Sequence, residues 1–166
     1  MSIRKIVYIG LFTGLMIVLT SIIAIPIGVN GYINLSDLLI MLLSTYLDGF
    51  SIFIIAGIGC AFSDIFLGYS NYAIFTLLIK GLEGLFMVYL FRKKMINNHI
   101  IIFILGGLIM LTGYGLVDIL LFNDIKMFIP SIILNLPQAL SCILMASLLF
   151  KPFKLIGRKI DESKEY

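Results

Sequence analysis

Long apolar segments fill most of this sequence, and they constrain the fold more than any other feature. Of the 166 residues, 61% are hydrophobic and only 13% are charged, and the mean hydropathy is +1.13. Soluble domains carry about 25% charged residues, and a water-soluble fold of this size has no way of burying so much apolar surface. The chain is therefore predicted to be an integral membrane protein, with one membrane domain over residues 1–166.

Six apolar segments predict an all-α bundle of six transmembrane helices. A spanning helix needs about 20 mostly apolar residues, and Pro26 and Pro152 mark expected helix ends. The connections are short, which favours antiparallel packing of neighbouring helices. The expected helices cover residues 6–25, 35–47 (a short one), 51–67, 73–91, 100–121 and 129–150, and residues 151–166 are expected to form a polar cytoplasmic tail.

Lysine and arginine residues at the ends of the apolar segments predict the orientation of the bundle. With six spans, three basic groups fall on the same side of the membrane, and an excess of positive charge marks the cytoplasmic side. Both termini are therefore expected in the cytoplasm. The three groups are Arg4 with Lys5, Arg92 with Lys93 and Lys94, and the tail residues Lys151, Lys154, Arg158, Lys159 and Lys164.

Several classes of function lack their sequence signals. The basic residues lie at segment ends and not along one face, so no nucleic-acid partner is expected. Cys60, Cys142 and His99 are isolated and show no metal-ligand spacing, so neither a metal site nor a cofactor is expected. No GxxxxGK[ST], GxSxG or HExxH motif occurs, so the chain is not expected to be an enzyme. Uptake against a gradient would then need an energised partner or a coupling ion.

Polar and ionisable residues inside the apolar segments gather in the half that is predicted to face outside. Such groups are costly at membrane depth and point to pairing or function. Lys80 and Glu83, spaced i, i+3, share a helix face with Thr76, one turn before Lys80. Contacts that only join helices have no reason to favour one leaflet, so a cavity for a small polar ring is predicted there. The other polar residues in this half are Asp37, Asp64, Tyr69, Tyr72, Tyr114, Asp118, Asn135 and Gln138.

Each of these groups also has a structural interpretation that the sequence leaves open. Lys80 and Glu83 can simply pair and hold their helix against its neighbours, and Asp37 and Asp64 can cap helix ends. Tyr69 can belong to the belt of aromatic residues at a membrane interface. In the first segment, Gly10 and Gly14 form a GxxxG motif, whose small-residue face packs either inside the bundle or against a partner protein.

Three short motifs, taken together with the six segments, resemble the substrate-binding S components of energy-coupling factor (ECF) vitamin transporters. They are Gly-Tyr-Ile-Asn-Leu-Ser-Asp at 31–37, Gly-Tyr-Ser-Asn-Tyr-Ala at 68–73 and Leu-Ile-Lys-Gly-Leu-Glu-Gly at 78–84. The resemblance is to the riboflavin-type and the hydroxymethylpyrimidine- and pyridoxine-type groups. Ser36 stands where the first motif usually has glycine.

The resemblance implies a six-helix membrane protein in the plasma membrane of a prokaryote, with its ligand site on the extracellular side. It implies two kinds of partner besides the lipid bilayer and the vitamin: a transmembrane coupling protein and two ATPase subunits. Gly10 and Gly14 correspond to a docking surface usually written AxxxA. The implied ligand-binding residues are Asn34, Tyr72, Thr76, Lys80, Glu83, Tyr114, Asp118, Asn135 and Gln138.

The resemblance does not name the ligand, because one fold binds several vitamins. A pyridine or pyrimidine alcohol suits an acid-rich polar cavity best, and riboflavin comes next. The chain has no tryptophan, which argues against a thiamine-type site. The alternative is an autonomous proton- or ion-coupled carrier that uses Asp64, Glu83 and Asp118 as relay carboxylates, although no inverted repeat is visible. A membrane enzyme is disfavoured, because no nucleophile and base are paired.

Overall fold

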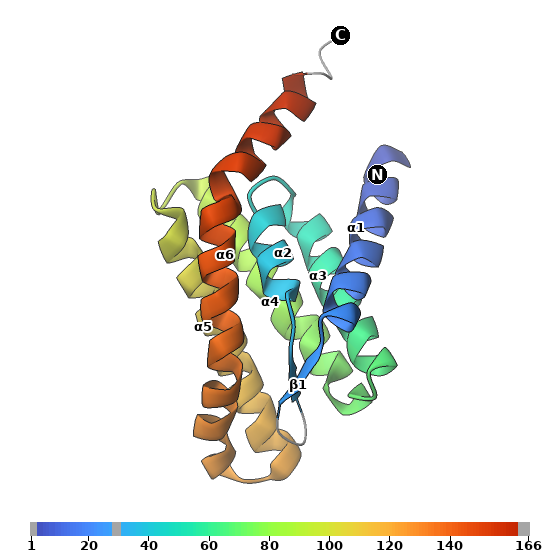
Figure 1. Ribbon diagram of the computed structural model, residues 1–166, viewed down its shortest axis with the longest axis vertical. Helices are drawn as coiled ribbons and strands as arrows, with labels where there is room; N and C mark the ends of the chain where they lie inside the picture. The colour runs from blue at the N-terminus through green and yellow to red at the C-terminus, as the bar shows by residue number, and fades with distance from the viewer. Residues whose placement is uncertain (1–2, 28–30, 163–166) are drawn as a thin grey trace.

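The computed structural model describes residues 3–27 and 31–162, which form a helical bundle with one β-hairpin (Figure 1). The hairpin links the first two helices, and a short 3-10 helix links the last two. In chain order the elements are α1 (Ile3–Ile22), β1 (Ile25–Ile27), β2 (Gly31–Ile33), α2 (Ser36–Leu43), α3 (Gly49–Phe66), α4 (Ser70–Lys93), α5 (His99–Phe122), η1 (Ile125–Met127) and α6 (Phe128–Glu162).

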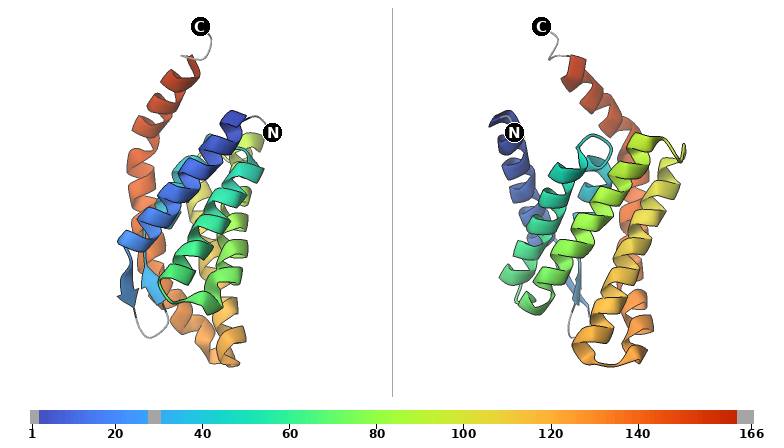
Figure 2. Two further views of the ribbon diagram at one scale, coloured as in Figure 1. Left: turned by 90° about the vertical axis from the view of Figure 1, so that its right-hand side faces the viewer. Right: turned by 180° about the vertical axis from the view of Figure 1, so that it is seen from behind.

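Helices α3 to α6 run alternately up and down, and α1 lies against the outside of α3 (Figures 1 and 2). We call the end of the bundle at which α1 begins and α6 ends the terminal end, and the other the opposite end. The turns between α3 and α4 and between α5 and α6 lie at the opposite end (Figure 1). The basic residues that end α4, Arg92 and Lys93, are thus at the same end as Arg4 and Lys5 of α1.

Five helices of the described chain, α1 and α3 to α6, are long and apolar enough to cross a membrane. The remaining helix, α2, has eight residues and rises only about 12 Å. The structure therefore has the six helices predicted from the sequence, but α2 is too short to be a full span by itself.

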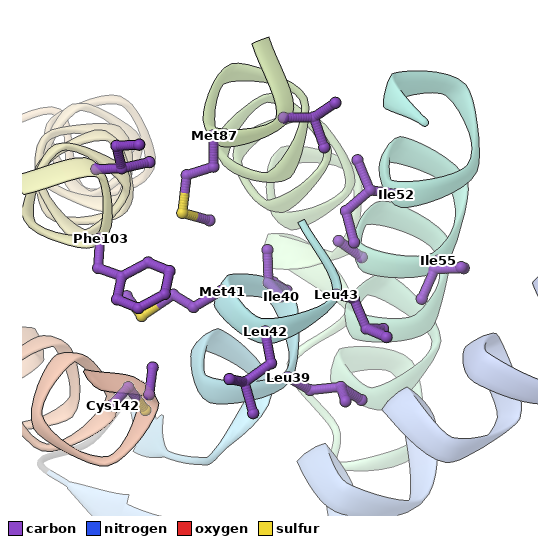
Figure 3. Packing of buried hydrophobic residues seen from close by; sticks show 14 of the residues in the cluster. Leu39, Ile40, Met41, Leu42, Leu43, Ile52, Ile55, Met87, Phe103 and Cys142 are labelled. Atoms are coloured by element: carbon purple, nitrogen blue, oxygen red, sulfur yellow. The ribbon is translucent and has the colours of Figure 1, made fainter. Parts of the chain in front are cut away.

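Helix α2 is nonetheless the centre of the hydrophobic core (Figure 3). Nearly every side chain of α2 is buried, as expected for a helix that is apolar on all sides. Its neighbours in the core include Ile52 and Ile55 of α3, Met87 of α4, Phe103 of α5 and Cys142 of α6. The apolar residues that α2 itself supplies are Leu39, Ile40, Met41, Leu42 and Leu43.

The β-hairpin is a departure from the all-α prediction. Helix α1 ends at Ile22, earlier than the expected residue 25, and Pro26 lies in β1, where it pairs with Tyr32 of β2. Both strands of a two-stranded sheet are edge strands, and proline is tolerated on an edge because it need not donate to the ladder. The sequence pattern predicts a helix end at Pro26, and the structure shows that the chain continues there as a strand.

The end of α6 is a second correction. This helix was expected to stop at residue 150, before Pro152, and to be followed by a polar tail. It instead contains both Pro137 and Pro152 and continues to Glu162, beyond the other helices at the terminal end (Figure 1). Residues 163–166 of the expected tail lie outside the described residues. A proline removes one helical hydrogen bond, and here the helix continues in spite of it.

Glycines allow α1 and α4 to approach α3 closely. A Cβ added at Gly59 of α3 would lie 2.7 Å from Met16 of α1, and one added at Gly57 would lie 2.6 Å from the backbone oxygen of Leu77 in α4. Met16 is fully buried, and with Thr20 it makes up the buried residues of α1. Both fully buried residues of α1 therefore lie in its second half.

Candidate functional site

A polar cavity of about 60 Å³ lies at the opposite end of the bundle. It is enclosed by β2, by the segments that follow β2 and α3, and by helices α3 to α6. Every lining residue has a polar group, and four of the residues are tyrosines. The lining residues are Tyr32, Asn34, Asp64, Tyr69, Tyr72, Thr76, Tyr114, Asp118, Asn135 and Gln138.

Two tyrosine–aspartate pairs connect different elements around this cavity. The Tyr32 hydroxyl donates a 2.6 Å hydrogen bond to Asp64 Oδ1, which joins β2 to α3. The Tyr72 hydroxyl donates an equally short bond to Asp118 Oδ1, which joins α4 to α5. Burial and the neighbouring Asp64 carboxylate raise the pKa of Tyr32, so this phenol remains protonated and keeps donating. Each pair holds a carboxylate in place at the cavity wall.

The tyrosine rings also supply aromatic surface. The rings of Tyr32 and Tyr69 are 5.1 Å apart between centroids, at an angle of 34°. On the other side, the Tyr114 hydroxyl lies 3.0 Å from Thr76 Oγ1. The cavity therefore combines flat aromatic faces with fixed hydroxyl and carboxylate groups, which suits an aromatic ring that carries polar substituents.

Gln138 connects the cavity to a buried group of charges. Its Oε1 accepts a 2.9 Å hydrogen bond from the backbone N–H of Asn34, and its Nε2 donates a 2.6 Å bond to Asp37 Oδ2. The Asn34 side chain in turn accepts from the N–H of Ser36 at the start of α2. The cavity wall, α6 and the entry to α2 are thus held together by one amide side chain.

The charges below the cavity are those of Asp37, Lys80 and Glu83, which we call the ion cluster. The Lys80 ammonium contacts the Asp37 carboxylate directly and lies 3.3 Å from Glu83 Oε2. All three side chains are 2% exposed or less, so their mutual attraction is little weakened by solvent. Lys80 Nζ also lies 5.7 Å from the centre of the Tyr114 ring, one of the cavity walls. The cluster therefore supports the cavity from beneath.

Seven of the nine ligand-binding residues implied by the sequence line this one cavity. They are Asn34, Tyr72, Thr76, Tyr114, Asp118, Asn135 and Gln138. Lys80 and Glu83 do not line it, because they point into the ion cluster beneath. The pairing of Lys80 with Glu83 that the sequence allowed is present, but Asp37, which was considered a helix cap, is the second partner of Lys80.

Three lining residues are not among the nine that the sequence implies. Tyr32 was not considered, although its position two residues before Asn34 places both on one side of an extended segment. Asp64 and Tyr69 were left between structural and functional roles, and both line the cavity. The two-residue spacing of Tyr32 and Asn34 is visible in the sequence. It indicates a shared face only if residues 31–33 form a strand, which the structure shows.

The other predicted site, the glycine pair of α1, is not used inside this chain. Gly10 and Gly14 are exposed, and a Cβ added at either would meet nothing within 4 Å. The sequence allowed this glycine face to pack either inside the bundle or against a partner protein. In the described part of the chain it does not pack inside the bundle, so the first of these predictions is wrong. As for metals, no group of three potential ligands occurs among the residues the structure describes.

The fold and the cavity define a small helical membrane protein with a polar aromatic site at one end of its bundle. A family model described as ECF-type riboflavin transporter, S component, matches residues 1–155. Because the match covers nearly all of the sequence, the chain belongs to this family of transporter subunits, which confirms the resemblance seen in its motifs. It is a multi-pass membrane protein, and its family is one of transport and not of enzymes.

A similar protein also matches most of this chain, but its description names no ligand. A protein of Pyrococcus woesei, described as an uncharacterized protein in gap 3'region, is 34% identical to this chain over 135 residues. The match covers 71% of this chain and 87% of the relative.

Proposed function

We propose that this chain captures a small water-soluble vitamin or vitamin precursor in the cavity at the opposite end of the bundle. The favoured ligand is a single aromatic ring with hydroxyl groups, of the pyridoxine or hydroxymethylpyrimidine type. The observation that carries this proposal is the set of fixed polar groups between tyrosine faces, above all the Tyr32–Asp64 and Tyr72–Asp118 pairs. Carboxylates held in this way accept hydrogen bonds from ring hydroxyl or amino groups.

The size of the cavity favours one ring over several. Its volume of about 60 Å³ is far below the roughly 300–1,000 Å³ of common ligand pockets. A single ring therefore requires the smallest movement of the lining side chains. Riboflavin, with three fused rings and a ribityl chain, is the second candidate, and the observation in its favour is the riboflavin-type family model that matches the chain.

Membership of the family supports a proposal for how the ligand is delivered. We propose that the chain works with a transmembrane coupling protein and two ATPase subunits, and that the exposed Gly10 and Gly14 face of α1 contributes to the contact. The basic residues at the terminal end support a cytoplasmic location for this end in a prokaryotic plasma membrane, and hence an extracellular cavity. The autonomous carrier is not favoured by a family whose members are subunits.

Binding to the purified full-length chain tests this proposal. Native mass spectrometry identifies any small molecule retained from the host, and calorimetric titration compares pyridoxine, hydroxymethylpyrimidine and riboflavin. We expect one of the single-ring compounds to bind at least about tenfold more tightly than riboflavin, which corresponds to about 1.4 kcal/mol. The reverse order would establish the second candidate, and binding of none of the three would contradict both.

Paired variants locate the binding. Asp118→Asn should weaken ligand binding about tenfold, because hydrogen bonds to charged groups contribute about 1.5–3 kcal/mol. Asp124→Asn is the matched control, since Asp124 lies just beyond α5 at the same end but does not line the cavity. Equal effects of the two substitutions would show that the ligand is held elsewhere.

A further inference from the structure

A second and larger cavity lies at the terminal end of the bundle. Its volume is about 280 Å³, and it is formed by the start of α1, the turn between α2 and α3, and the end of α4. It is at the other end from the tyrosine-lined cavity and shares no residue with it. The proposed vitamin-binding function therefore does not use this cavity.

The charges around this cavity are unbalanced. Arg4, Lys5 and Arg92 line it, and Asp48 is the acidic residue among its lining side chains. Lys5 Nζ forms a 2.9 Å ion pair with Asp48, so one positive charge is matched. Arg4 and Arg92 have no acidic partner among the residues the structure describes. Two guanidinium groups from separate helices thus leave the cavity with a formal charge of +2.

Part of the cavity lining is apolar. Ile9 of α1, Leu47 of the turn between α2 and α3, and Ile55 of α3 supply it. The first half of α1 has no buried residue, and it presents Ile3, Val7 and Leu11, each more than half exposed, to its surroundings. Figure 2 shows α1 diverging from α3 toward this end. A membrane lipid is thereby able to reach the cavity along an apolar surface, with its charged group at the level of the arginines.

We propose that this cavity binds a phosphate group, carried either by an anionic membrane lipid or by a soluble phosphate ester. Two guanidinium groups are well suited to a phosphate, because each presents paired N–H donors that match its oxygens. The Tyr8 side chain also lines the cavity and offers a further hydroxyl donor. Anionic lipids attract basic residues near a membrane surface, and the apolar wall is suited to the first carbons of acyl chains.

Native mass spectrometry of the delipidated full-length protein separates the two sources. The lipid arm titrates dioleoyl phosphatidylglycerol against dioleoylglycerol, which has the same acyl chains and no phosphate. The soluble arm titrates glycerol 3-phosphate and inorganic phosphate. We expect phosphatidylglycerol to bind at least about tenfold more tightly than dioleoylglycerol, because its phosphate is attracted by the two guanidinium groups.

Matched variants decide whether the arginines are responsible. Arg4→Gln with Arg92→Gln should abolish this preference. Lys93→Gln with Lys94→Gln removes the same charge at the same end, from residues that do not line the cavity, and should change the affinity less than about twofold. Arg4→Lys with Arg92→Lys, which keeps the charge, should retain part of the binding. Thermal unfolding of each variant confirms that the bundle is intact.

The outcomes are distinct. Arginine-dependent binding of phosphatidylglycerol assigns the site to a lipid, whereas arginine-dependent binding of glycerol 3-phosphate alone assigns it to a soluble ester. Equal binding of phosphatidylglycerol and dioleoylglycerol, with no binding of soluble phosphates, would overturn the proposal. Equal losses in the arginine and lysine variants would also overturn it, because they would reduce the effect to general surface charge.

Discussion

Gln138 donates a 2.6 Å hydrogen bond from its side-chain amide to Asp37, and this contact joins the polar cavity to the ion cluster beneath it. The other end of the same amide accepts from the backbone N–H of Asn34. Gln138 and Asp37 are 101 residues apart in the sequence, so the contact fixes α6 against α2. A ligand that contacts Gln138 would therefore also affect the hydrogen bond between Gln138 and Asp37.

Replacement of Gln138 should impair both ligand binding and stability. Gln138→Leu has a similar size but leaves the Asn34 N–H and Asp37 Oδ2 without this partner, and each such loss costs about 1–3 kcal/mol in a buried site. We expect a lower midpoint of thermal unfolding and at least about tenfold weaker ligand binding. Ser141→Ala is the control, because the Ser141 hydroxyl bonds only to the backbone oxygen of its own helix among the contacts described. Wild-type behaviour of Gln138→Leu would contradict a bridging role.

The ion cluster should respond very differently to partial and to complete removal. Lys80→Met leaves Asp37 and Glu83 buried without their cation, and breaking a buried pair in this way costs about 3–5 kcal/mol. When Lys80→Met is combined with Asp37→Asn and Glu83→Gln, no charge remains, and the loss should be smaller. Unfolding in detergent, followed by circular dichroism, measures both variants, with Lys126→Met on the exposed η1 as control. If the triple variant is the less stable of the two, the cluster stabilises the fold by more than charge balance.

The sequence was sufficient to predict a membrane bundle and most of the cavity residues. Apolar runs and helix-length spacing carry that information locally, and polar groups at membrane depth are few enough to stand out. The sequence did not predict the contact between Lys80 and Asp37. Asp37 lies next to Lys80 because α2 is buried in the core. Contacts between residues 43 positions apart depend on packing that no local pattern encodes.

The hairpin shows a second limit of local patterns. Residues 26–34, between the first two expected helices, contain Pro26, two isoleucines and polar residues, and this composition predicts a loop. Ile25 pairs with Ile33 across the hairpin, and this pairing depends on the path of the chain between α1 and α2, which local composition does not encode. The continuation of α6 through Pro152 is similar, since the loss of one backbone bond did not end the helix.

Gly10 and Gly14 should be dispensable for the chain alone and important for transport. Because both residues are exposed and a Cβ at either position meets nothing within 4 Å, Gly10→Leu with Gly14→Leu should leave thermal unfolding and ligand binding unchanged. Uptake by cells that express the proposed coupling protein and ATPase subunits should fall sharply, since close helix contact needs small residues. Uptake at the wild-type level would place the docking surface elsewhere.

Gly57 provides the contrast for this experiment. A Cβ at Gly57 would lie 2.6 Å from the backbone oxygen of Leu77, so α3 and α4 would have to separate. Gly57→Ala should therefore lower the unfolding midpoint and reduce ligand binding and uptake together. Loss of uptake without loss of stability is expected only for the α1 pair, and a Gly57 variant of normal stability would show that the two helices tolerate separation.

Asp48 gives a prediction about pH. Partial burial raises the pKa of Asp48. Hydrogen bonds from Ser51, together with the charge and hydrogen bond of Lys5, lower it by more, so that the pKa of Asp48 falls to about 2. Since this value lies below the roughly 3.9 of an unfolded aspartate, ionised Asp48 stabilises the fold above about pH 4. That contribution is lost as the pH falls through about 2.

The unfolding midpoints of wild type and Asp48→Asn should therefore differ at pH 7 and converge as the pH is lowered from about 4 to about 2. The side chain of Asp48 also accepts the N–H of Ser51 at the start of α3, a cap that asparagine is able to replace. The difference at pH 7 thus reports the Asp48 charge, which both the Ser51 hydroxyl and Lys5 contact at Oδ2. Lys5→Gln should reproduce part of it, and the double variant should lose less than the sum of the two single losses, because both substitutions remove the same ion pair. A difference that stays constant down to pH 2 would show that Asp48 acts through packing and not through its charge.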